Sequence, residues 1–237
     1  IYRKLGLNPR NSGFLAPTIG NNSRFGFVLG DSFYWAINRS MDAEIGGEFL
    51  SARGWSQQAS YRAVLDSRTR LRLSFYGVED RGLGANKIDQ GGQSARAEGV
   101  TRIGPYMRGV LDFNYLSSLT FREAFSQTYS EAVSSEIHSF GFLSRNQGPH
   151  QLNLFLSRTE NFQSLQPNDA VRLRALPRID YRRLAQPIAA QLPFWLSLDA
   201  SVGLISRAEP SANPASRLKS SLFERVELFP RVSLPVR

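Results

Sequence analysis

The chain has 237 residues, 41% of them hydrophobic, and a mean hydropathy of −0.29. No run approaches the ~20 apolar residues of a transmembrane helix, which excludes helical membrane proteins but not β-barrels, because barrel strands alternate apolar and polar residues. Lys and Arg number 29 against 20 Asp and Glu, and this net charge of +9 favours anionic partners. The absence of cysteine excludes disulfides and thiolate metal sites.

The N-terminal residues 1–14 do not have the pattern of a signal peptide, because no apolar core follows the basic residues. The chain also begins with Ile rather than Met. We therefore expect it to be an internal part of a longer protein.

Apolar and polar residues alternate in segment after segment, the pattern of a strand with two different faces. We count about ten or eleven such segments of about ten residues each, whereas strands of soluble proteins average about five or six. The length favours a membrane barrel over a soluble sandwich. The clearest examples are residues 70–77, 106–116, 151–158, 194–204 and 225–234.

Short polar connectors rich in Gly, Asn, Asp and Pro separate these segments and predict antiparallel pairing. Three connections are longer. Residues 81–99 read as a Gly-rich loop, and residues 207–220 read as an exposed loop with two prolines. Residues 119–136 carry Phe121, Phe125 and Tyr129 at helical spacing, so an amphipathic helix and a strand followed by a bent loop both remain open.

The alternation also predicts which side chains share a face. We expect Leu154, Leu198 and Leu228 on the lipid side of a barrel, and Asn153, Asp199 and Glu227 on its wet interior. Alternating arginines could bind nucleic acid, but positions inside two-faced strands are better explained by a polar interior. These are Arg70, Arg72, Arg108, Arg172 and Arg174.

Few residues suggest chemistry. His138 and His150 are the only histidines, and no cluster of carboxylates accompanies them, so neither a metal site nor a Ser/His/Asp hydrolase is favoured. Phe33, Tyr34 and Trp35 are better read as an interfacial aromatic girdle than as a ligand platform. We therefore expect no enzyme activity, no catalytic residue, no metal and no cofactor.

One segment is distinctive. It contains Ser12, Gly13, Phe14 and Leu15, then Pro17 and Gly20, and a strand that ends in Phe33, Tyr34 and Trp35. In this it resembles the entry to the barrel of the LptD family, the LPS-assembly or organic solvent tolerance proteins. The resemblance continues through residues 41–55, returns at residues 112–126 and is weaker at residues 221–236.

The resemblance implies an all-β fold, an antiparallel meander that forms part of a large transmembrane barrel in the outer membrane of a Gram-negative bacterium. Residues 1–20 would be the end of a periplasmic jelly-roll and the linker that follows it, and residues 21–237 would be a partial transmembrane barrel. It implies transport of lipopolysaccharide (LPS) into the outer leaflet. The implied partners are LPS, an LptE-like plug lipoprotein, an LptA-like periplasmic bridge and membrane lipid, with no nucleic acid.

The family passes lipid between its first and last strands, and prolines in the first two strands weaken that seam. The alignment by resemblance puts Ser32 and Gly47 at those proline positions. The lateral-gate candidates are Phe27, Ser32, Phe33, Gly46 and Gly47. The lipid-phosphate candidates are Arg3, Lys4, Arg10 and Arg24.

The alternative function is that of a generic porin-like channel for small solutes. A constriction loop folded into the interior would favour that alternative.

Overall fold

The computed structural model describes residues 10–82, 87–126, 129–165, 169–189, 192–210 and 221–234. Arg3 and Lys4 therefore lie outside the described residues. Within the described parts of the chain, no helix is both long and apolar enough to span a membrane.

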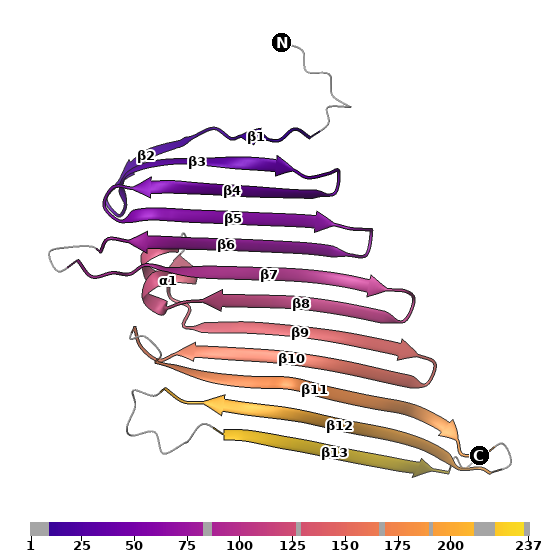
Figure 1. Ribbon diagram of the computed structural model, residues 1–237. Helices are drawn as coiled ribbons and strands as arrows, with labels where there is room; N and C mark the ends of the chain where they lie inside the picture. Colours follow the sequence, from indigo (N-terminus) through magenta and orange to yellow (C-terminus); the bar gives the residue numbers. More distant parts are fainter. Residues whose placement is uncertain are drawn as a thin grey trace. The chain divides into compact units, whose positions relative to one another are not determined.

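The described elements are thirteen strands and two short helices (Figure 1). Two strands are very short, and the other eleven have 10 to 18 residues, which confirms the predicted strand length. In chain order they are β1 (Gly13–Phe14), β2 (Thr18–Asn22), β3 (Gly26–Ala36), β4 (Met41–Leu50), β5 (Gly54–Val64), β6 (Arg70–Asp80), β7 (Gly92–Ile103), β8 (Met107–Leu116), α1 (Leu119–Phe125), α2 (Tyr129–Ala132), β9 (Glu136–Gln147), β10 (His150–Phe162), β11 (Ala170–Pro187), β12 (Trp195–Ala208) and β13 (Ser221–Ser233).

The strands follow one another in the sheet in chain order from β3 to β13, with β1 and β2 both paired to the outer edge of β3 (Figure 1). The registers that the structure describes are antiparallel. The prediction of an all-β antiparallel meander is confirmed. The Gly-rich loop is shorter than expected, because residues 92–99 belong to β7. That part of β7 alternates small and polar residues, so it lacks the apolar signal of a strand.

The chain divides into two compact units. Unit 1 contains residues 1–99 and 114–134, and therefore β1 to β6 and both helices. Unit 2 contains residues 100–113 and 135–237, and therefore β9 to β13.

Unit 1 has two contrasting faces. On β3, Phe27, Leu29, Phe33 and Trp35 alternate with buried or half-buried residues and are exposed. Cross-strand register extends this surface from Phe33 to Ile45 on β4, Ala59 on β5 and Phe75 on β6, and we call it the aromatic face. The opposite side, which we call the ion-pair face, carries Tyr34, Asp42, Glu44, Arg62 and Arg72.

Unit 2 also has two faces, and its register carries them from strand to strand. Leu154 pairs with Ile179, which pairs with Val202, which pairs with Val226. The face that these residues share is the leucine face, and it includes Leu198 and Leu228 as predicted. The neighbouring row of Asn153, Asp180, Ser201 and Glu227, together with Asp199, lies on the opposite polar face.

Two of the five alternating arginines lie on the other face from the one predicted. On β11, Leu176 and Pro177 together stand opposite Leu156, so the register shifts by one residue. This bulge moves Arg172 and Arg174 to the leucine face. There Arg172 bonds to Glu160, which is 4% exposed and also pairs with Arg158.

A buried core of unit 1, which we call the loop core, lies where the loops after β2, β4, β6 and β8 meet. Arg53 and Asp80, with side chains 2% and 0% exposed, form an ion pair of 3.1 Å. Arg53 also donates to Gln90 and places its guanidinium 4.8 Å from the ring centre of Phe125. The Nε atom of Arg53 and the Oδ1 atom of Asp80 have no hydrogen-bond partner.

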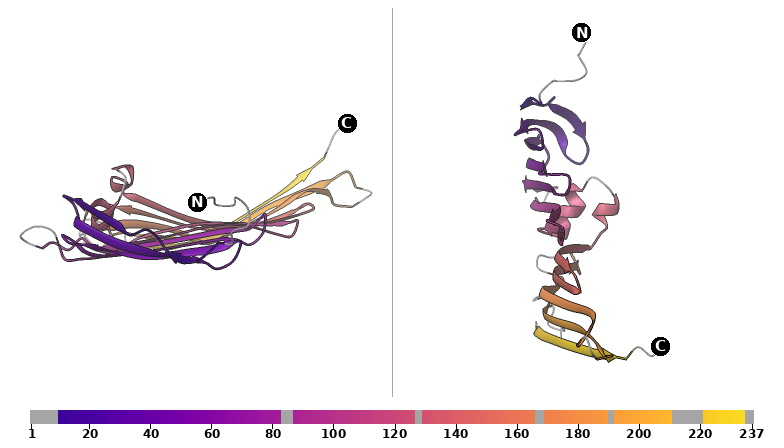
Figure 2. Two further views of the ribbon diagram at one scale, coloured as in Figure 1. Left: turned by 90° about the horizontal axis from the view of Figure 1, so that it is seen from above. Right: turned by 90° about the vertical axis from the view of Figure 1, so that its right-hand side faces the viewer.

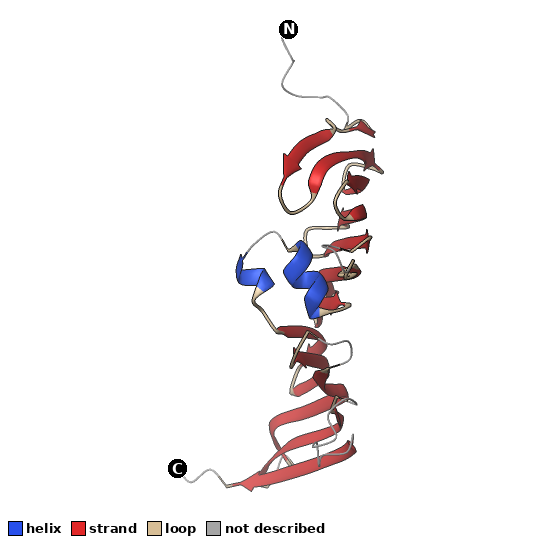
Figure 3. Ribbon diagram, turned by 90° about the vertical axis from the view of Figure 1, so that its left-hand side faces the viewer, coloured by secondary structure: helices blue, strands red, loops and turns tan. Residues whose placement is uncertain are grey.

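Helix α1 forms the cover of this core. Ser118 caps its N-terminus by accepting from the backbone N–H of Phe121, and Phe121 and Phe125 are buried. Phe121 packs against Tyr76, and Phe125 stacks on Phe25. Since Tyr76 belongs to the ion-pair face, the helix lies on that side, and Figures 2 and 3 show it to one side of the neighbouring strands. Of the two readings of residues 119–136, a helix is correct for 119–125, and Tyr129 begins α2.

The buried ion pair yields a stability prediction. Replacing Asp80 by Ala leaves the Arg53 guanidinium buried without a countercharge, so we expect the free energy of unfolding to fall by about 3–5 kcal/mol. Urea titration of the full-length protein in lipid vesicles, followed by tryptophan fluorescence, measures this change. The neighbouring Glu79→Ala, at an exposed position on the aromatic face, should change the same quantity by less than about 0.5 kcal/mol. Equal losses for both variants would contradict this account of the core.

Candidate functional site

The edge of unit 1 is a strand in two pieces, and this interruption is its most unusual feature. β1 pairs Gly13 with Tyr34 and Phe14 with Phe33, whereas β2 pairs Thr18 with Gly30. The register changes by one residue between the pieces, so Ala16 and Pro17 together stand opposite Asp31. This two-against-one arrangement is a β-bulge, and proline contributes no ladder donor within it.

The bulge leaves a backbone donor of β3 without its usual acceptor. The N–H of Leu15 donates to the carbonyl of Ser32, at 2.9 Å, but the N–H of Ser32 turns instead to Oδ1 of Asp31, at 2.7 Å. A side chain therefore satisfies a group that a regular ladder would bond to the edge strand. The edge strand is therefore bonded less well to β3 at the bulge than along β1 or β2.

Three of the predicted gate residues surround this point. Ser32 pairs in register with Gly46, and its hydroxyl donates to Oε1 of Glu44 at 3.0 Å. A Cβ atom on Gly46 would lie 2.7 Å from Cβ of Ser32, so this close approach of β3 and β4 requires glycine. Gly47 stands opposite Asp31 on the aromatic face.

The two predicted gate phenylalanines lie on the aromatic face, one on each side of the bulge. Phe33 is 36% exposed and packs edge-to-face on Phe14, with ring centres 5.3 Å apart, so this pair crosses from β3 to the edge strand. Phe27 is 46% exposed and pairs in register with Asn21 of β2. The side chains on both sides of the bulge are therefore aromatic and accessible.

A polar row crosses the aromatic face at the level of the bulge. Asp31 pairs with Gly47, Gly47 with Gln57, and Gln57 with Gly77. Apolar or aromatic residues flank this row on one side, from Phe33 to Phe75, and on the other from Leu29 to Trp55. A carboxylate, an amide and two positions without side chains thus interrupt an otherwise apolar surface next to the seam.

Arg10 and Arg24, the two lipid-phosphate candidates that the structure describes, do not come together. Arg10 pairs with Asp42 at 3.0 Å, and Asp42 also accepts from Arg62 and Tyr34 on the ion-pair face. Arg24, beyond the other end of the edge strand, donates to the carbonyls of Glu123 and Ser126 at the C-terminal end of α1. Both described arginines therefore have protein partners.

A further arginine, Arg122, is half-buried within α1 itself. It donates from Nη1 to the carbonyl of Ser134, and burial lowers the pKa of its guanidinium from the usual value, while the charge of Glu131 opposes that shift. Arg24 therefore joins the turn between β2 and β3 to α1, and Arg122 joins α1 to the residues that follow α2.

The two histidines do not come together. His138 lies on the polar face of unit 2, where its Nδ1 is 3.2 Å from Oγ1 of Thr159. His150 lies on the leucine face, where its Nδ1 is 2.8 Å from the hydroxyl of Tyr181. Within the residues that the structure covers, no group of three or more His, Asp or Glu side chains is placed to hold a metal ion.

Sequence reasoning missed the role of Pro17 at the bulge between β1 and β2. Ser32 and Gly47 had been matched to the prolines of the first two strands, but β1 and β2 precede β3, so Ser32 lies in the second strand from the edge and Gly47 in the third. The signal that could have found it is a proline between two short segments in which apolar and polar residues do not alternate regularly. The boundary predicted at residue 20 stays a prediction.

The chain is similar over nearly its whole length to curated LPS-assembly proteins LptD. It is 29% identical to that of Nitrosospira multiformis over 248 residues, which cover 96% of this chain and 23% of the relative. It is 29% identical to that of Nitrosococcus oceani (97% of this chain, 29% of the relative) and 26% identical to that of Actinobacillus pleuropneumoniae (73% and 22%). No family model matches the chain. The chain spans about a quarter of the length of these relatives, and the resemblance to the LptD family is confirmed.

The bulge generates a prediction about the edge strand. Pro17→Val supplies a backbone donor and a residue that favours strands, so we expect β2 to open less often. Amide exchange over residues 18–22 of the full-length protein should slow by about two- to tenfold, the equivalent of one net hydrogen bond. Thr18→Val, which leaves the donors of the ladder unchanged, serves as the control. Unchanged exchange in Pro17→Val would mean that proline does not limit pairing here.

Proposed function

We propose, from the similarity of this chain to a segment of LptD-family proteins over nearly its whole length, that it forms part of an outer-membrane β-barrel. In this proposal the barrel inserts LPS into the outer leaflet of the cell outer membrane. The aromatic face of unit 1 and the leucine face of unit 2 meet lipid, and the ion-pair and polar faces line the interior.

The observation that carries the proposal is an apolar band with polar residues at both ends. On β10, Leu152, Leu154 and Leu156 lie between His150 at one end and Arg158 at the other, on one face. Eight residues of strand extend about 27 Å. At the usual tilt of about 40–45° this spans roughly 20 Å of membrane, close to the band of about 25 Å on outer-membrane barrels. A soluble sandwich would need a second sheet over this face.

The connections suggest how the barrel is oriented. In each unit the strands are joined at one end by short turns, such as residues 37–40, 104–106 and 148–149. The connections at the other end include the longer segments 81–91 and 117–135. Outer-membrane barrels have short periplasmic turns and longer external loops, so the short-turn ends are assigned to the periplasm.

The proposed exit for lipid is the seam at the outer side of the edge strand, between the first and last strands of the barrel. A bulge at Ala16 and Pro17 weakens pairing between the edge strand and β3. Phe27, Ser32, Phe33, Gly46 and Gly47 are proposed to line the lateral gate, and Pro17 is added to this set. The polar row through Asp31 would let polar groups of an amphipathic lipid approach an otherwise apolar surface.

The remaining elements of the proposal follow from the same resemblance. An LptE-like lipoprotein would occupy the interior, an LptA-like bridge would deliver LPS from the periplasm, and residues 1–20 would lead from the periplasmic jelly-roll into the edge strand of the barrel. Arg3, Lys4, Arg10 and Arg24 are proposed to meet lipid phosphates. At Arg10 a phosphate would have to compete with the carboxylate of Asp42.

A transport role without catalysis is proposed, since the relatives carry the name of assembly proteins. The porin alternative is not favoured by these relatives. Helix α1 does lie on the ion-pair face, as a constriction loop would. However, it lies near the ends of the strands, at the side of the longer connections. There Phe121 contacts Tyr76 and lies so close to Gly92 that a Cβ atom on that glycine would be 3.1 Å from Cβ of Phe121.

Site-specific crosslinking tests the transport route. A photo-crosslinking amino acid at Phe27 or Phe33 of the full-length protein should trap LPS during transport in cells, because these positions flank the seam. The same group at Leu154, on a distant strand of the leucine face, should trap several-fold less. Equal trapping at all three positions, or no trapping while solutes diffuse freely through the barrel, would favour the porin alternative.

Arginine scanning tests which face meets lipid. Val202 lies in the middle of the band on β12, and its neighbour Ser201 lies on the polar face between Asp180 and Glu227. Val202→Arg should make folding into lipid vesicles less favourable by about 2–4 kcal/mol, the cost of an arginine at a barrel midplane. Ser201→Arg should change it far less. A reversed order of the two costs would show that the leucine face is the interior.

A further inference from the structure

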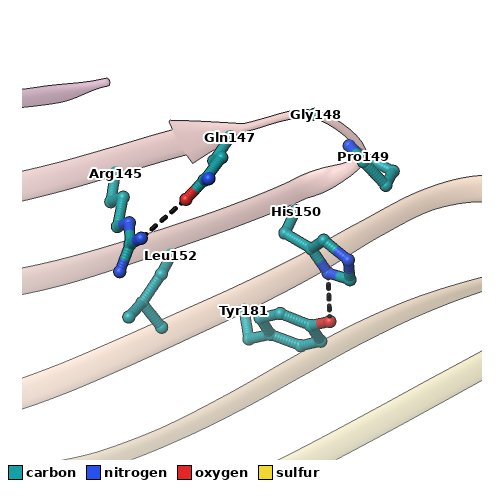
Figure 4. Close-up of a pocket in the computed structure, with 7 residues that line it drawn as sticks. All are labelled: Arg145, Gln147, Gly148, Pro149, His150, Leu152 and Tyr181. Atoms are coloured by element: carbon teal, nitrogen blue, oxygen red, sulfur yellow. Dashed lines mark hydrogen bonds between the residues drawn. The ribbon is translucent and has the colours of Figure 1, made fainter. Parts of the chain in front are cut away.

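A hollow of about 580 Å³ opens on the leucine face of unit 2, at the turn between β9 and β10 (Figure 4). Its polar groups come from three neighbouring strands: Arg145 and Gln147 from β9, His150 from β10 and Tyr181 from β11. Leu152 forms its side toward the apolar band. The hollow thus lies at the boundary between polar and apolar surface.

Hydrogen bonds hold the side chains that line the hollow. Nη2 of Arg145 donates to Oε1 of Gln147 at 2.6 Å, and the His150 and Tyr181 rings stack with centres 6.1 Å apart and a 2.8 Å bond between Nδ1 and the hydroxyl (Figure 4). These contacts fix the groups without neutralising any charge. Arg145 keeps further guanidinium donors, and Nε2 of His150 bonds to no residue in the described part of the chain.

The charge at this place is unbalanced. Seven of the twelve described arginines of unit 2 pair with a carboxylate, as Arg178 does with Asp180 and Arg182 with Asp199. Among the described residues, no Asp or Glu forms an ion pair with Arg145 or with Arg183. Arg183 stands directly opposite His150 in register, on the same face, and its Nε is buried without a partner. Two arginines on the strands either side of β10, of which Arg145 lines the hollow, therefore lack a carboxylate partner among the described residues.

We infer that this hollow binds the phosphate of a membrane phospholipid whose acyl chains lie along Leu152 and Leu154. The guanidinium fork suits phosphate, and the imidazole and the phenol hydroxyl offer further donors. The apolar band begins at the same residues, so the phosphate of one lipid molecule would neutralise the arginines while its acyl chains cover the exposed leucines. A soluble anion would satisfy only the first. The inference rests on the proposed function, which turns the leucine face to lipid and puts this turn at the periplasmic rim.

Native mass spectrometry of the full-length protein tests the site. The protein is released from detergent with phosphatidylglycerol as the probe, and bound lipid is counted before and after the double substitution Arg145→Gln with Arg183→Gln. We expect retained lipid to fall at least about tenfold, as for the loss of a charge-assisted hydrogen bond. Arg108→Gln is the matched control: Arg108 lies near the same end of unit 2, on the polar face opposite Ser144, and also lacks a carboxylate partner among the described residues.

The outcomes separate this inference from the proposed function. Insertion of the wild-type protein into lipid vesicles is measured in parallel, and failure to insert would overturn both. Normal insertion with equal lipid retention in wild type and double variant would overturn the site alone, as would an equal loss in Arg108→Gln. An excess of inorganic phosphate should not displace the lipid. Complete displacement would assign the hollow to a free anion instead.

Discussion

Side chains on a β-strand alternate between its two faces, and the whole molecule depends on keeping that alternation in register from strand to strand. A slip of one residue would move every apolar side chain of a strand to the opposite face. In unit 2 the register holds from Leu154 through Ile179 and Val202 to Val226. An apolar band results that no single strand could provide. Its partner face carries carboxylates and arginines in ion pairs.

At two bulges the register shifts by one residue, and each shift has a local effect. At Leu176 and Pro177 an extra residue in β11 turns Arg172 and Arg174 to the leucine face, beyond the band, where Glu160 neutralises part of their charge. At Ala16 and Pro17 an extra residue in the edge strand leaves the N–H of Ser32 to the side chain of Asp31. One bulge ends an apolar surface, and the other weakens an edge.

The loop core of unit 1 supplies buried packing that the sheet itself lacks. A sheet with one face toward lipid and one toward a wet interior has little apolar packing of its own, and the largest fully buried side chains of unit 1 are Arg53 and Leu50. The stacked Phe25 and Phe125 join the turn between β2 and β3 to α1, and the buried pair of Arg53 and Asp80 joins the turn between β4 and β5 to the end of β6. The edge strand is thus held at the end near α1 and weak at its bulge, which in the proposed barrel suits a seam that opens locally.

The sequence by itself determined the all-β meander, the strand length and the two faces, because a period of two is visible in the residues without any tertiary information. It also carried the resemblance to the LptD family through the residues around Phe14 and Trp35. The tertiary structure decided what depends on pairing. Pro17 became part of a bulge only through its place opposite Asp31, and Arg172 and Arg174 changed face only through the extra residue at Leu176 and Pro177. Arg145 and Arg183, distant in sequence, became neighbours of His150 because β9 and β11 both pair with β10. Register and bulges are properties of strand pairs, so a single strand's sequence does not contain them.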